Sequence, residues 1–587
     1  MTRRGPAGGV RRWDGRRWDG AGAWRTAWRL ARYRPGLYAA SMALWVAFHA
    51  LPLGVGLVLQ RVFDALAGPR PAAVSLAGLL AVLVAVEAAR AVDLWLASRV
   101  WTSSWHHMGA LLRLNMLHAQ LASGGPEAAV LPGTPGEAVT RFRDDVDDLL
   151  QFLDTWLDVA GTMLFAGVAV ALMVRIDPVV TVAVALPLAG MAVATRTLAG
   201  RIRAWRRADR EATAAVTGFL GELFASVLTV KAAGAAGAAL RRLGELNRAR
   251  GRAALRDQLC SDLLDSFNAS TVDLGIGLVL LLAAPAMRRG DFTVGDLTLF
   301  ASYTGHLIGL PYFAGRLLVR RRQAGVAVER MTRLLPPTAP GSLVTPRRVD
   351  LTGRGTASDP SPSRPRRVPR DRLEVIELRG LSAVHPSSGR GVRGADLLLR
   401  RGTLTVVSGP VGSGKTTLLR ALLGLLPLDA GQVRWNGGPV DDPAAFLVPP
   451  RCAYVPQVPR LFSESLADNL LLGASPPAGD LAAAVRLAVL DEDVAAMPDG
   501  LATLVGARGV RLSGGQAQRA AVARAFVRRP ELVVLDDVSS ALDLDTEARL
   551  WERLLTGETT CLAVSNRAAT LARADQVVRL DRGRVVG

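Results

Sequence analysis

The sequence predicts a multi-domain membrane protein, in which a six-span α-helical transmembrane domain precedes an α/β domain of the P-loop NTPase class. Three observations support this prediction. Apolar stretches of about 20 residues, enough to cross ~30 Å of hydrocarbon, recur through the first half of the chain. A glycine-rich phosphate-binding pattern lies in the C-terminal third, between an apolar strand and a helix. A stretch rich in Pro, Ser and Arg separates the two regions.

The apolar stretches account for the composition of the chain. The 587 residues are 50% hydrophobic, and their mean hydropathy of +0.24 is high for a soluble protein. The fifth stretch is approached through Asp262, Asp265 and Asp273, so we expect this span to begin further back, near Leu263. The six predicted spans lie near Leu37–Leu59, Val74–Ala97, Leu157–Val174, Val179–Ala194, Leu274–Met287 and Leu297–Leu318.

Arginine sets the predicted topology. The two long connections, residues 98–156 and 195–262, are rich in Arg, and such connections belong on the cytoplasmic side. The loops between the other spans are short and face outward. Six spans return the chain to the cytoplasm, so we expect a multi-pass protein of the cytoplasmic membrane with its N-terminus and its C-terminal domain inside.

The first 35 residues form a basic, Trp-rich tail. The pentapeptide Arg-Arg-Trp-Asp-Gly occurs at 11–15 and again at 16–20, and Trp and Arg continue to Arg32. Two interpretations stay open. Arginines at anionic headgroups with tryptophans at the interface predict an in-plane elbow before the first span. Alternatively, residues 1–20 are a disordered basic tail.

The phosphate-binding pattern fits G-x-x-x-x-G-K-[ST] at 409–416, after the apolar strand 404–407. Backbone N–H groups and a helix N-terminus converge there on a phosphate, and Lys415 reaches the β and γ oxygens. Thr416 and Asp536, which closes a later apolar strand, are placed to hold Mg²⁺. ATP and Mg²⁺ are therefore the predicted cofactors. The predicted cradle is Gly409, Gly412, Ser413, Gly414, Lys415, Thr416 and Thr417.

These features divide the chain into a tail (1–35), a transmembrane domain (36–334), a Pro/Ser/Arg-rich linker (335–372) and a nucleotide-binding domain (373–587). The three cysteines show no metal spacing and all fall on the predicted cytoplasmic side, so neither a disulfide nor a zinc site is implied.

The C-terminal domain resembles the ATP-binding cassette (ABC) family, most specifically in the signature peptide Leu512-Ser513-Gly514-Gly515-Gln516. In that family the Ser and glycines bind the γ-phosphate held by the P-loop of a partner subunit, so one copy supplies half of a site. The resemblance further implies a Q-loop glutamine at Gln457, which senses the γ-phosphate and Mg²⁺, a D-loop ending at Asp543, and an adenine-stacking ring at His385. A solvated loop histidine is an equally good account of His385.

Two residues depart from the family pattern. Asp537 stands where a Glu usually polarises the attacking water, and its side chain is about 1.5 Å shorter. Asn566 stands where the family has a switch histidine, and an amide carries no positive charge. Two interpretations follow. Either hydrolysis at this chain's own site is slow, which suggests a heterodimer with one competent and one slow site, or Asp537 and Asn566 are a tolerated variant. Catalysis would rest on Lys415, Gln457, Asp537 and Asn566.

The resemblance implies ATP-driven export of an amphipathic small molecule, lipid or peptide by one half of a dimeric transporter. The predicted partners are a second half-transporter, the lipid bilayer and an unidentified substrate. The formal charge of +20 is spread over connections, tail and linker without a nucleic-acid motif, so no nucleic-acid partner is expected. The alternative is an ATP-gated regulatory or channel-like membrane protein with little hydrolysis of its own.

Polar residues inside the predicted spans are candidate substrate contacts, because an intramembrane charge is a functional hypothesis by default. His49, Asp273 and His306 belong to this group. Glu87, Arg90 and Asp93 lie three residues apart on one helix, so we expect them to pair with one another.

Overall fold

The computed structural model describes residues 21–67, 75–122, 135–307, 309–335, 340–351, 372–385, 389–506, 512–556 and 559–586. Within these ranges the chain divides into two compact units, a helical one drawn from 1–115, 139–332 and 341–351, and a second one drawn from 116–138, 333–340 and 352–587. The duplicated pentapeptide and most of the predicted linker, 336–339 and 352–371, lie outside the described residues. The four predicted domain boundaries stay predictions.

The chain up to residue 344 consists mainly of long helices, of which the stretches 116–138 and 333–340 are grouped with the second unit. In order they are α1 (Ala21–Ala31), α2 (Pro35–Ala67), α3 (Leu76–Ala122), α4 (Pro135–Thr140), the π-helical turn η2 (Arg141–Asp145), α5 (Val146–Ile176), α6 (Pro178–Ala225), α7 (Val227–Ala232), α8 (Ala236–Arg289), α9 (Val294–Leu307), α10 (Gly309–Thr332) and the 3₁₀ turn η3 (Pro340–Val344).

The six predicted spans all fall on these helices. The first five lie on α2, α3, α5, α6 and α8, and the sixth is shared by α9 and α10. Among the described residues, two helical segments, Pro35–Ala67 and Gly136–Ile176, are long and apolar enough to cross a membrane by length and composition alone. The count of six spans stays a prediction.

The core of the helical unit lies where α2, α5 and α9 pack together. Tyr303 is fully buried there, and its hydroxyl donates a 2.7 Å hydrogen bond to the Leu53 carbonyl oxygen. A Cβ on Gly56 would lie 2.3 Å from the Tyr303 ring, so glycine is what lets α2 approach α9. The short turn between α5 and α6 is capped by Asp177, whose carboxylate accepts from the backbone N–H groups of Val179 and Val180 at 2.8 and 3.1 Å.

Charged pairs join α10 to α5. Three arginines of α10 face three aspartates along η2 and α5, namely Arg316 and Asp158 at 4.0 Å, Arg320 and Asp148 at 3.8 Å, and Arg330 and Asp145 at 3.5 Å. The Asp158 carboxylate also lies 3.4 Å from the ring of His49, a candidate substrate contact. On α3, Arg90 pairs with Glu87 at 3.7 Å, as expected from their spacing. The three Arg–Asp pairs thus join α10 to η2 and α5, whereas the Arg90–Glu87 pair lies within α3.

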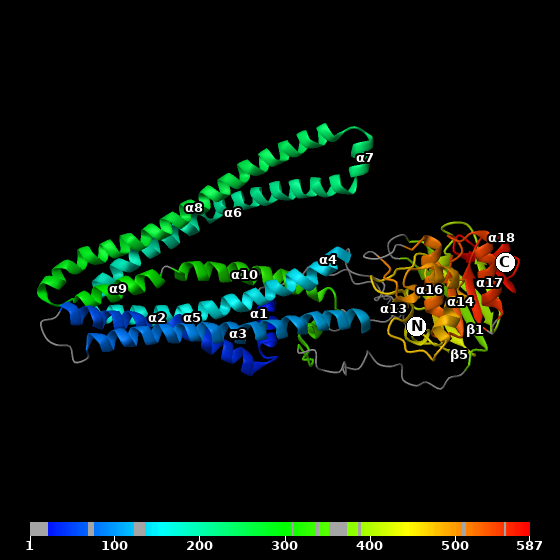
Figure 1. Ribbon diagram of the computed structural model, residues 1–587, viewed down its shortest axis with the longest axis horizontal. Coiled ribbons are helices and arrows are strands. Elements are labelled where there is room, and N and C mark those ends of the chain that lie inside the picture. Colours follow the sequence, from blue (N-terminus) through cyan, green and yellow to red (C-terminus); the bar gives the residue numbers. More distant parts are fainter. Residues whose placement is uncertain are drawn as a thin grey trace, which may run out of the picture. The chain divides into compact units, whose positions relative to one another are not determined.

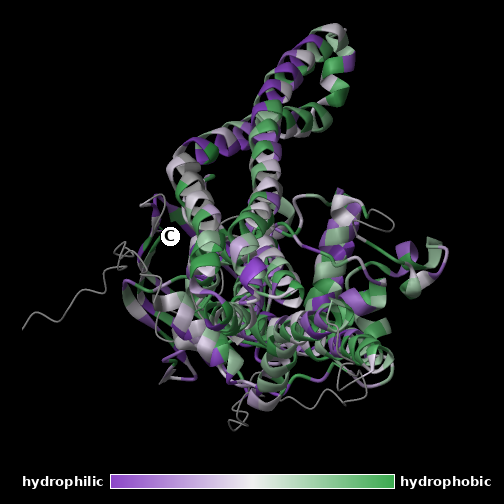
Figure 2. Cartoon of the chain, turned by 90° about the vertical axis from the view of Figure 1, so that its left-hand side faces the viewer, coloured by the Kyte–Doolittle hydropathy of each residue, from purple (hydrophilic) through white to green (hydrophobic). Residues whose placement is uncertain are grey.

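Helices α6 and α8 form an arm. Figure 1 shows them side by side, joined at their far ends by α7. Large apolar side chains of the arm are exposed, among them Phe224 at 73%, Leu228 at 78% and Leu240 at 67%. Figure 2 shows hydrophobic residues, in green, mixed with hydrophilic ones, in purple, along the arm. The arm therefore presents apolar surface that the described part of this chain leaves uncovered.

The second unit contains two sheets. The first is antiparallel with the strand order β2-β1-β4-β5, and the second has the order β10-β9-β3-β8-β7-β6, in which all strands but β10 run parallel. The strands are β1 (Val375–Val384), β2 (Gly391–Arg400), β3 (Leu404–Ser408), β4 (Ala430–Trp435), β5 (Gly438–Pro439), β6 (Cys452–Val455), β7 (Leu532–Asp536), β8 (Thr560–Val564), β9 (Gln576–Asp581) and β10 (Arg584–Val585).

Helices cover the larger sheet, as its fully apolar strands require. Strands β7 and β8 are buried along their whole length. The helices are α11 (Lys415–Leu422), α12 (Pro443–Phe446), α13 (Leu466–Leu471), α14 (Asp480–Leu487), α15 (Asp491–Ala496), α16 (Gly514–Phe526), α17 (Leu544–Leu555) and α18 (Ala568–Leu571), with a 3₁₀ turn, η4, at Gly500–Ala502. The predicted alternation of strands and helices around the P-loop is confirmed.

Candidate nucleotide-binding site

Four neighbouring parallel strands bring the predicted site residues to one edge of the sheet. The register pairs Val407 of β3 with Val564 of β8, Val564 with Asp536 of β7, and Leu535 with Val455 of β6, so the four strands end together. The carboxyl ends of such strands are where an open α/β sheet binds its ligands. The P-loop, Gln457, Asp537 and Asn566 all follow these ends.

The P-loop has a backbone that requires glycine. Gly409 and Gly414 adopt φ angles of 146° and 107°, and a Cβ on Gly409 would lie 2.1 Å from the Leu580 carbonyl oxygen. The buried Ser413 hydroxyl has no hydrogen-bond partner within the described ranges. An unpartnered buried donor beside a helix N-terminus suits a phosphate oxygen.

Lys415, the first residue of α11, folds back over this loop. Its Nζ donates to the carbonyl oxygens of Gly409 and Pro410 at 2.7 and 2.9 Å. Burial lowers the pKa of Lys415, although the carboxylates of Asp537 and Asp536 act in the opposite direction. The ammonium group is therefore held over the cradle by backbone oxygens, with two carboxylates near enough to influence it. Thr417 is half-buried in the first turn of α11.

The predicted Mg²⁺ ligands meet at the end of β7. The Thr416 hydroxyl donates a 3.0 Å hydrogen bond to one Asp536 oxygen, and the Tyr454 hydroxyl donates to the other at 3.1 Å. Asp536 is only 1% exposed. A buried carboxylate beside a hydroxyl is an all-oxygen donor pair of the kind that Mg²⁺ accepts, with water and phosphate oxygens completing its octahedron. These residues fit the ion, which would neutralise phosphate charge when bound.

Asp537, the predicted base, lies next to the Q-loop. Its φ angle is 55°, a left-handed conformation that is uncommon for a residue with a side chain. Its carboxylate accepts a 3.2 Å hydrogen bond from the Gln457 side-chain amide. Burial raises the pKa of Asp537, while the bond from Gln457 acts to lower it. The short carboxylate is thus already engaged by a neighbouring amide.

Asn566 contacts the start of the P-loop. Its amide oxygen accepts from the Ser408 hydroxyl at 3.0 Å and from the Gly409 backbone N–H at 3.1 Å. The side chain itself is exposed at the sheet edge. Asn566, at the switch position, is therefore hydrogen-bonded to the start of the P-loop through its side-chain oxygen.

The signature peptide forms the N-terminus of α16. Ser513 is the N-cap, and its hydroxyl accepts from the Gln516 backbone N–H at 3.2 Å while the Gln516 side chain accepts from the Ser513 N–H at 2.9 Å. This reciprocal pair is a capping box. Ser513 and Gly514 are exposed, so their donors are accessible. Asp543 caps the next helix, α17, by accepting from the Thr546 N–H at 2.9 Å.

His385 lies at the end of β1, half-buried, with its backbone bonded to Arg390 and Gly389. The three residues that follow it lie outside the described ranges. The stacking role of His385 stays a prediction.

Arg567, which follows Asn566, is a residue that no motif indicated. Its guanidinium donates to the Glu547 carboxylate, to the Leu542 carbonyl oxygen at 3.1 Å and to the Ser540 carbonyl oxygen at 3.3 Å. Glu547 is 1% exposed and also accepts from the Thr570 hydroxyl at 2.8 Å. Arg567 thus joins the switch segment to the D-loop. The only sequence signal is its position directly after Asn566.

Gln518 is a second residue that the motifs did not indicate. Its side-chain amide donates to the Gln457 carbonyl oxygen and to the Ser540 hydroxyl, both at 3.3 Å, and its oxygen accepts from the Ala541 N–H at 3.4 Å. The helix of the signature peptide is thereby bonded to the Q-loop and the D-loop.

Two family models match this chain. The model of the ABC transporter transmembrane region matches residues 39–310, and the model of the ABC transporter ATP-binding domain matches residues 392–540. The chain belongs to the ABC transporter family. Its helical transmembrane region and its cassette are fused in one polypeptide, which confirms the predicted fold class apart from the number of spans.

Relatives of this ABC transporter are bacterial. An uncharacterized ABC transporter ATP-binding protein of Mycobacterium tuberculosis is 28% identical over 459 residues, which cover 76% of this chain and 75% of the relative. The ATP-dependent lipid A-core flippase of Burkholderia orbicola is 40% identical over 188 residues, 32% of each chain. A solved bacterial Atm1-family ABC exporter with ATP bound shares the fold, with a TM-score of 0.71 and 21% identity over 94% of both chains.

These findings define the general activity. The chain is a half-transporter with the fold of an ABC exporter, a multi-pass membrane protein whose ATP-binding domain couples ATP hydrolysis to transport. ABC exporters act as dimers in the membrane, so the chain needs a second half-transporter.

Proposed function

We propose that this half-transporter moves an amphipathic solute outward across the cytoplasmic membrane, that its partner is a different half-transporter, and that its own ATP site is the slower of the two. Its N-terminus and cassette lie in the cytoplasm, where ATP is available. Thr416, Gln457 and Asp536 hold Mg²⁺ in the loaded site.

This proposal rests on the contacts of Asp537 and Asn566, the two residues that depart from the family pattern. Asp537 is one methylene shorter than Glu and is bonded to Gln457 at 3.2 Å, which leaves it poorly placed to orient an attacking water. Asn566 uses its oxygen to bind Ser408 and Gly409, and it has no charge to offer a γ-phosphate. The phosphate cradle stays complete, so binding persists while the chemical step is slow.

The intact signature peptide supports a different partner. Ser513, Gly514 and Gly515 lie at the N-terminus of a capped helix. There they can bind the γ-phosphate that the P-loop of another subunit holds. A heterodimer would then contain one site with a full set of residues from both chains and one site with Asp537 and Asn566.

The substrate class rests on the relatives. The flippase that is 40% identical to this chain over 188 residues acts on a lipid, according to its name, and lipids are amphipathic. The arm of α6, α7 and α8 exposes large apolar side chains, among them Phe224, Leu228 and Leu240, and burial of such surface from water against a second subunit would stabilise a dimer.

The test is ATP hydrolysis by the purified chain alone. We expect slow turnover, and we expect Asp537→Glu with Asn566→His to raise it by about a hundredfold or more, because a positioned general base contributes roughly 10²–10⁴-fold. Asp441→Glu, the same change at an exposed position, is the control and should have no effect.

Brisk hydrolysis by the unmodified chain would remove the slow-site proposal. Reconstitution with the partner in vesicles separates transport from gating. Solute movement that requires ATP turnover supports export, whereas ATP-dependent permeability without turnover would support the ATP-gated alternative.

A further inference from the structure

Tyr454 lies beside the predicted Mg²⁺ ligands because of the register of two parallel strands. The pairing of β6 with β7 places Val534 opposite Tyr454, and Asp536 follows Val534 by two residues. Side chains alternate between the two faces of a sheet, so all three point to the same face. From there the Tyr454 hydroxyl donates a 3.1 Å hydrogen bond to Asp536 Oδ2.

The packing of the sheet agrees with this division into faces. Val534 belongs to a buried cluster that includes Leu418 of α11, and Tyr454 packs against the same cluster. The alternate residues of β7 belong to a different cluster. Helix α11, which carries Thr416 in its first turn, therefore covers the face from which Tyr454 and Asp536 project. The tyrosine ring is held by apolar packing while its hydroxyl meets the carboxylate.

The two oxygens of Asp536 have different donors. The Thr416 hydroxyl donates to Oδ1 at 3.0 Å, and the Tyr454 hydroxyl donates to Oδ2. The carboxylate is 1% exposed, so these donors fix its orientation more than bulk water does. A ligand that is already oriented loses less side-chain freedom when a metal ion binds. The structure thus prepares Asp536 for an ion from both sides.

We infer that Tyr454 is a positioning residue for Mg²⁺, because its hydroxyl holds Asp536 in the orientation in which this carboxylate and Thr416 receive the ion. The inference rests on the proposed assignment of Thr416 and Asp536 to Mg²⁺. Tyr454 acts through Asp536, as the outer hydrogen-bond partners of metal ligands generally do. Loss of such a partner weakens metal affinity by about tenfold to a hundredfold.

The test is Mn²⁺ binding to the full-length chain in detergent, loaded with one equivalent of a non-hydrolysable ATP analogue. Electron paramagnetic resonance measures the free aqueous ion, so the result does not depend on hydrolysis. We expect Tyr454→Phe to bind Mn²⁺ about tenfold more weakly than the wild type, because phenylalanine keeps the ring and lacks only the donor. Its affinity for a fluorescent ATP analogue in EDTA should be unchanged, since the phosphate cradle is intact.

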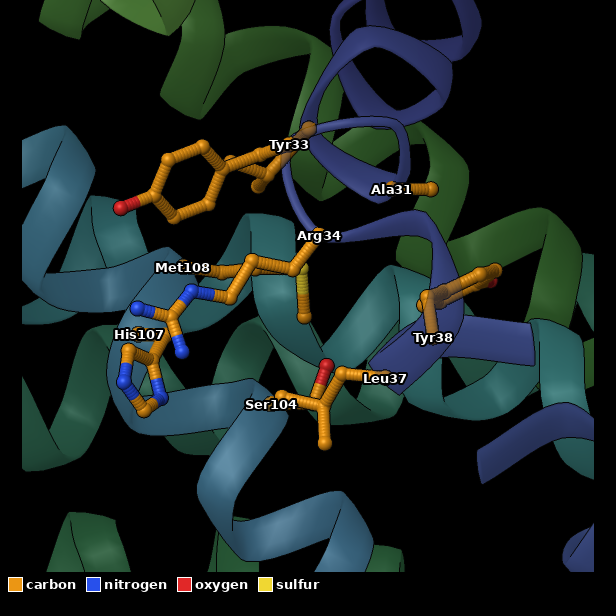
Figure 3. Close-up of a pocket in the computed structure, with 9 residues that line it drawn as sticks. Ala31, Tyr33, Arg34, Leu37, Tyr38, Ser104, His107 and Met108 are labelled. Carbon is orange, nitrogen blue, oxygen red and sulfur yellow. The ribbon is translucent and has the colours of Figure 1, made fainter. Parts of the chain in front are cut away.

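Tyr33→Phe is the matched control. Tyr33 lies at the turn between α1 and α2 in the helical unit, where Figure 3 shows its ring, and its hydroxyl donates to the Arg347 carbonyl oxygen at 2.7 Å. This variant loses the same hydrogen-bonding group outside the cassette. It should bind Mn²⁺ as tightly as the wild type.

Asp536→Asn separates this inference from the proposed Mg²⁺ site. Weak Mn²⁺ binding by Asp536→Asn, together with wild-type binding by Tyr454→Phe, would overturn the role of Tyr454 and leave the Mg²⁺ site in place. Unchanged binding by Asp536→Asn would overturn the Mg²⁺ assignment itself. If Tyr454→Phe weakens Mn²⁺ binding and nucleotide binding in EDTA to the same extent, the inference is overturned in favour of a general role in the folding of the site.

Discussion

The cassette has two edges that are expected to contact nucleotide. They differ in how closely their residues follow the family pattern. The P-loop edge consists of the cradle, Asp536, Asp537 and Asn566, and the signature edge consists of the peptide 512–516 and Asp543. Ser513 and Gly514 of the signature edge are exposed, Gly515 is half-buried, and the helix starts with a full capping box. At the P-loop edge the cradle has the required backbone, but the base and the switch are altered.

With the proposed roles of Asp537 and Asn566, binding and chemistry depend on separate parts of the site. Phosphate binding relies on backbone N–H groups and Lys415, which the glycine conformations of the loop fix locally. Hydrolysis relies on the reach and charge of two side chains from other strands, and these can change without disturbing the cradle. A chain built in this way can bind ATP at its own site and complete the chemistry at its partner's.

The largest effect is expected from damage to the signature edge in the assembled heterodimer. Gly515→Asp adds a negative charge and places a Cβ 3.0 Å from the Ala541 carbonyl oxygen. We expect the ATPase of the complex to fall by about a hundredfold to a thousandfold, the usual cost of losing a preorganised oxyanion donor. Lys415→Ala at the P-loop edge should cost about tenfold or less, because the affected site contributes little turnover.

Steady-state ATPase of the two complexes, at equal protein concentration and with equal assembly by size-exclusion chromatography, makes the comparison. The reverse order, with Lys415→Ala as the more damaging change, would show that the P-loop edge carries most of the turnover.

Arg567 is expected to give the next largest effect, on stability, because it connects the two edges. Arg567→Met removes the partner of the buried Glu547 carboxylate and two hydrogen bonds to the D-loop backbone. Loss of one member of a buried pair costs about 3 kcal/mol. Thermal unfolding of the cassette should therefore shift to lower temperature, and the double variant Arg567→Met with Glu547→Gln should recover part of the loss.

A midpoint unchanged in Arg567→Met would mean that solvent reaches Glu547 and replaces the guanidinium. Arg573→Met is a suitable control, since Arg573 is exposed and lies outside this network.

The motifs of the cassette were predictable because each encodes local geometry. A strand, a glycine turn and a helix N-terminus follow one another in the P-loop, so Lys415 and Thr416 could be placed from the sequence. The same holds for the capped signature helix, because Ser513 and Gln516 satisfy each other three residues apart. The individual roles of these residues in catalysis remain predictions.

Contacts across sequence distance were not predictable. Asn566 meets Gly409, 157 residues away, only because β3 and β8 are neighbours with matched ends. In the membrane half, His49 was a candidate substrate contact, but its approach to Asp158 depends on how α2 packs against α5. A Cβ on Gly161 would lie 2.7 Å from the His49 ring, so this approach also needs a glycine that no pattern indicated.

The smallest expected effect is the pH dependence of ATP binding. This measurement also distinguishes the contributions of the two edges to binding. The signature peptide has no titrating side chain, so any change at alkaline pH must come from the P-loop edge. Burial lowers the pKa of Lys415, and only the protonated amine attracts phosphate. Affinity should be full at neutral pH and fall as the pH rises through this lowered pKa, earlier than for an ordinary lysine at about 10.4.

Binding of a fluorescent ATP analogue to the purified chain, measured from neutral pH to about pH 10, gives the profile. We expect a loss of up to about tenfold, as for one charge-assisted hydrogen bond. Lys415→Arg is the matched control, because a guanidinium stays charged throughout and should give a flat profile. If wild type and Lys415→Arg lose affinity in parallel, the lysine is not the titrating group, and burial does not lower its pKa enough to discharge it in this range.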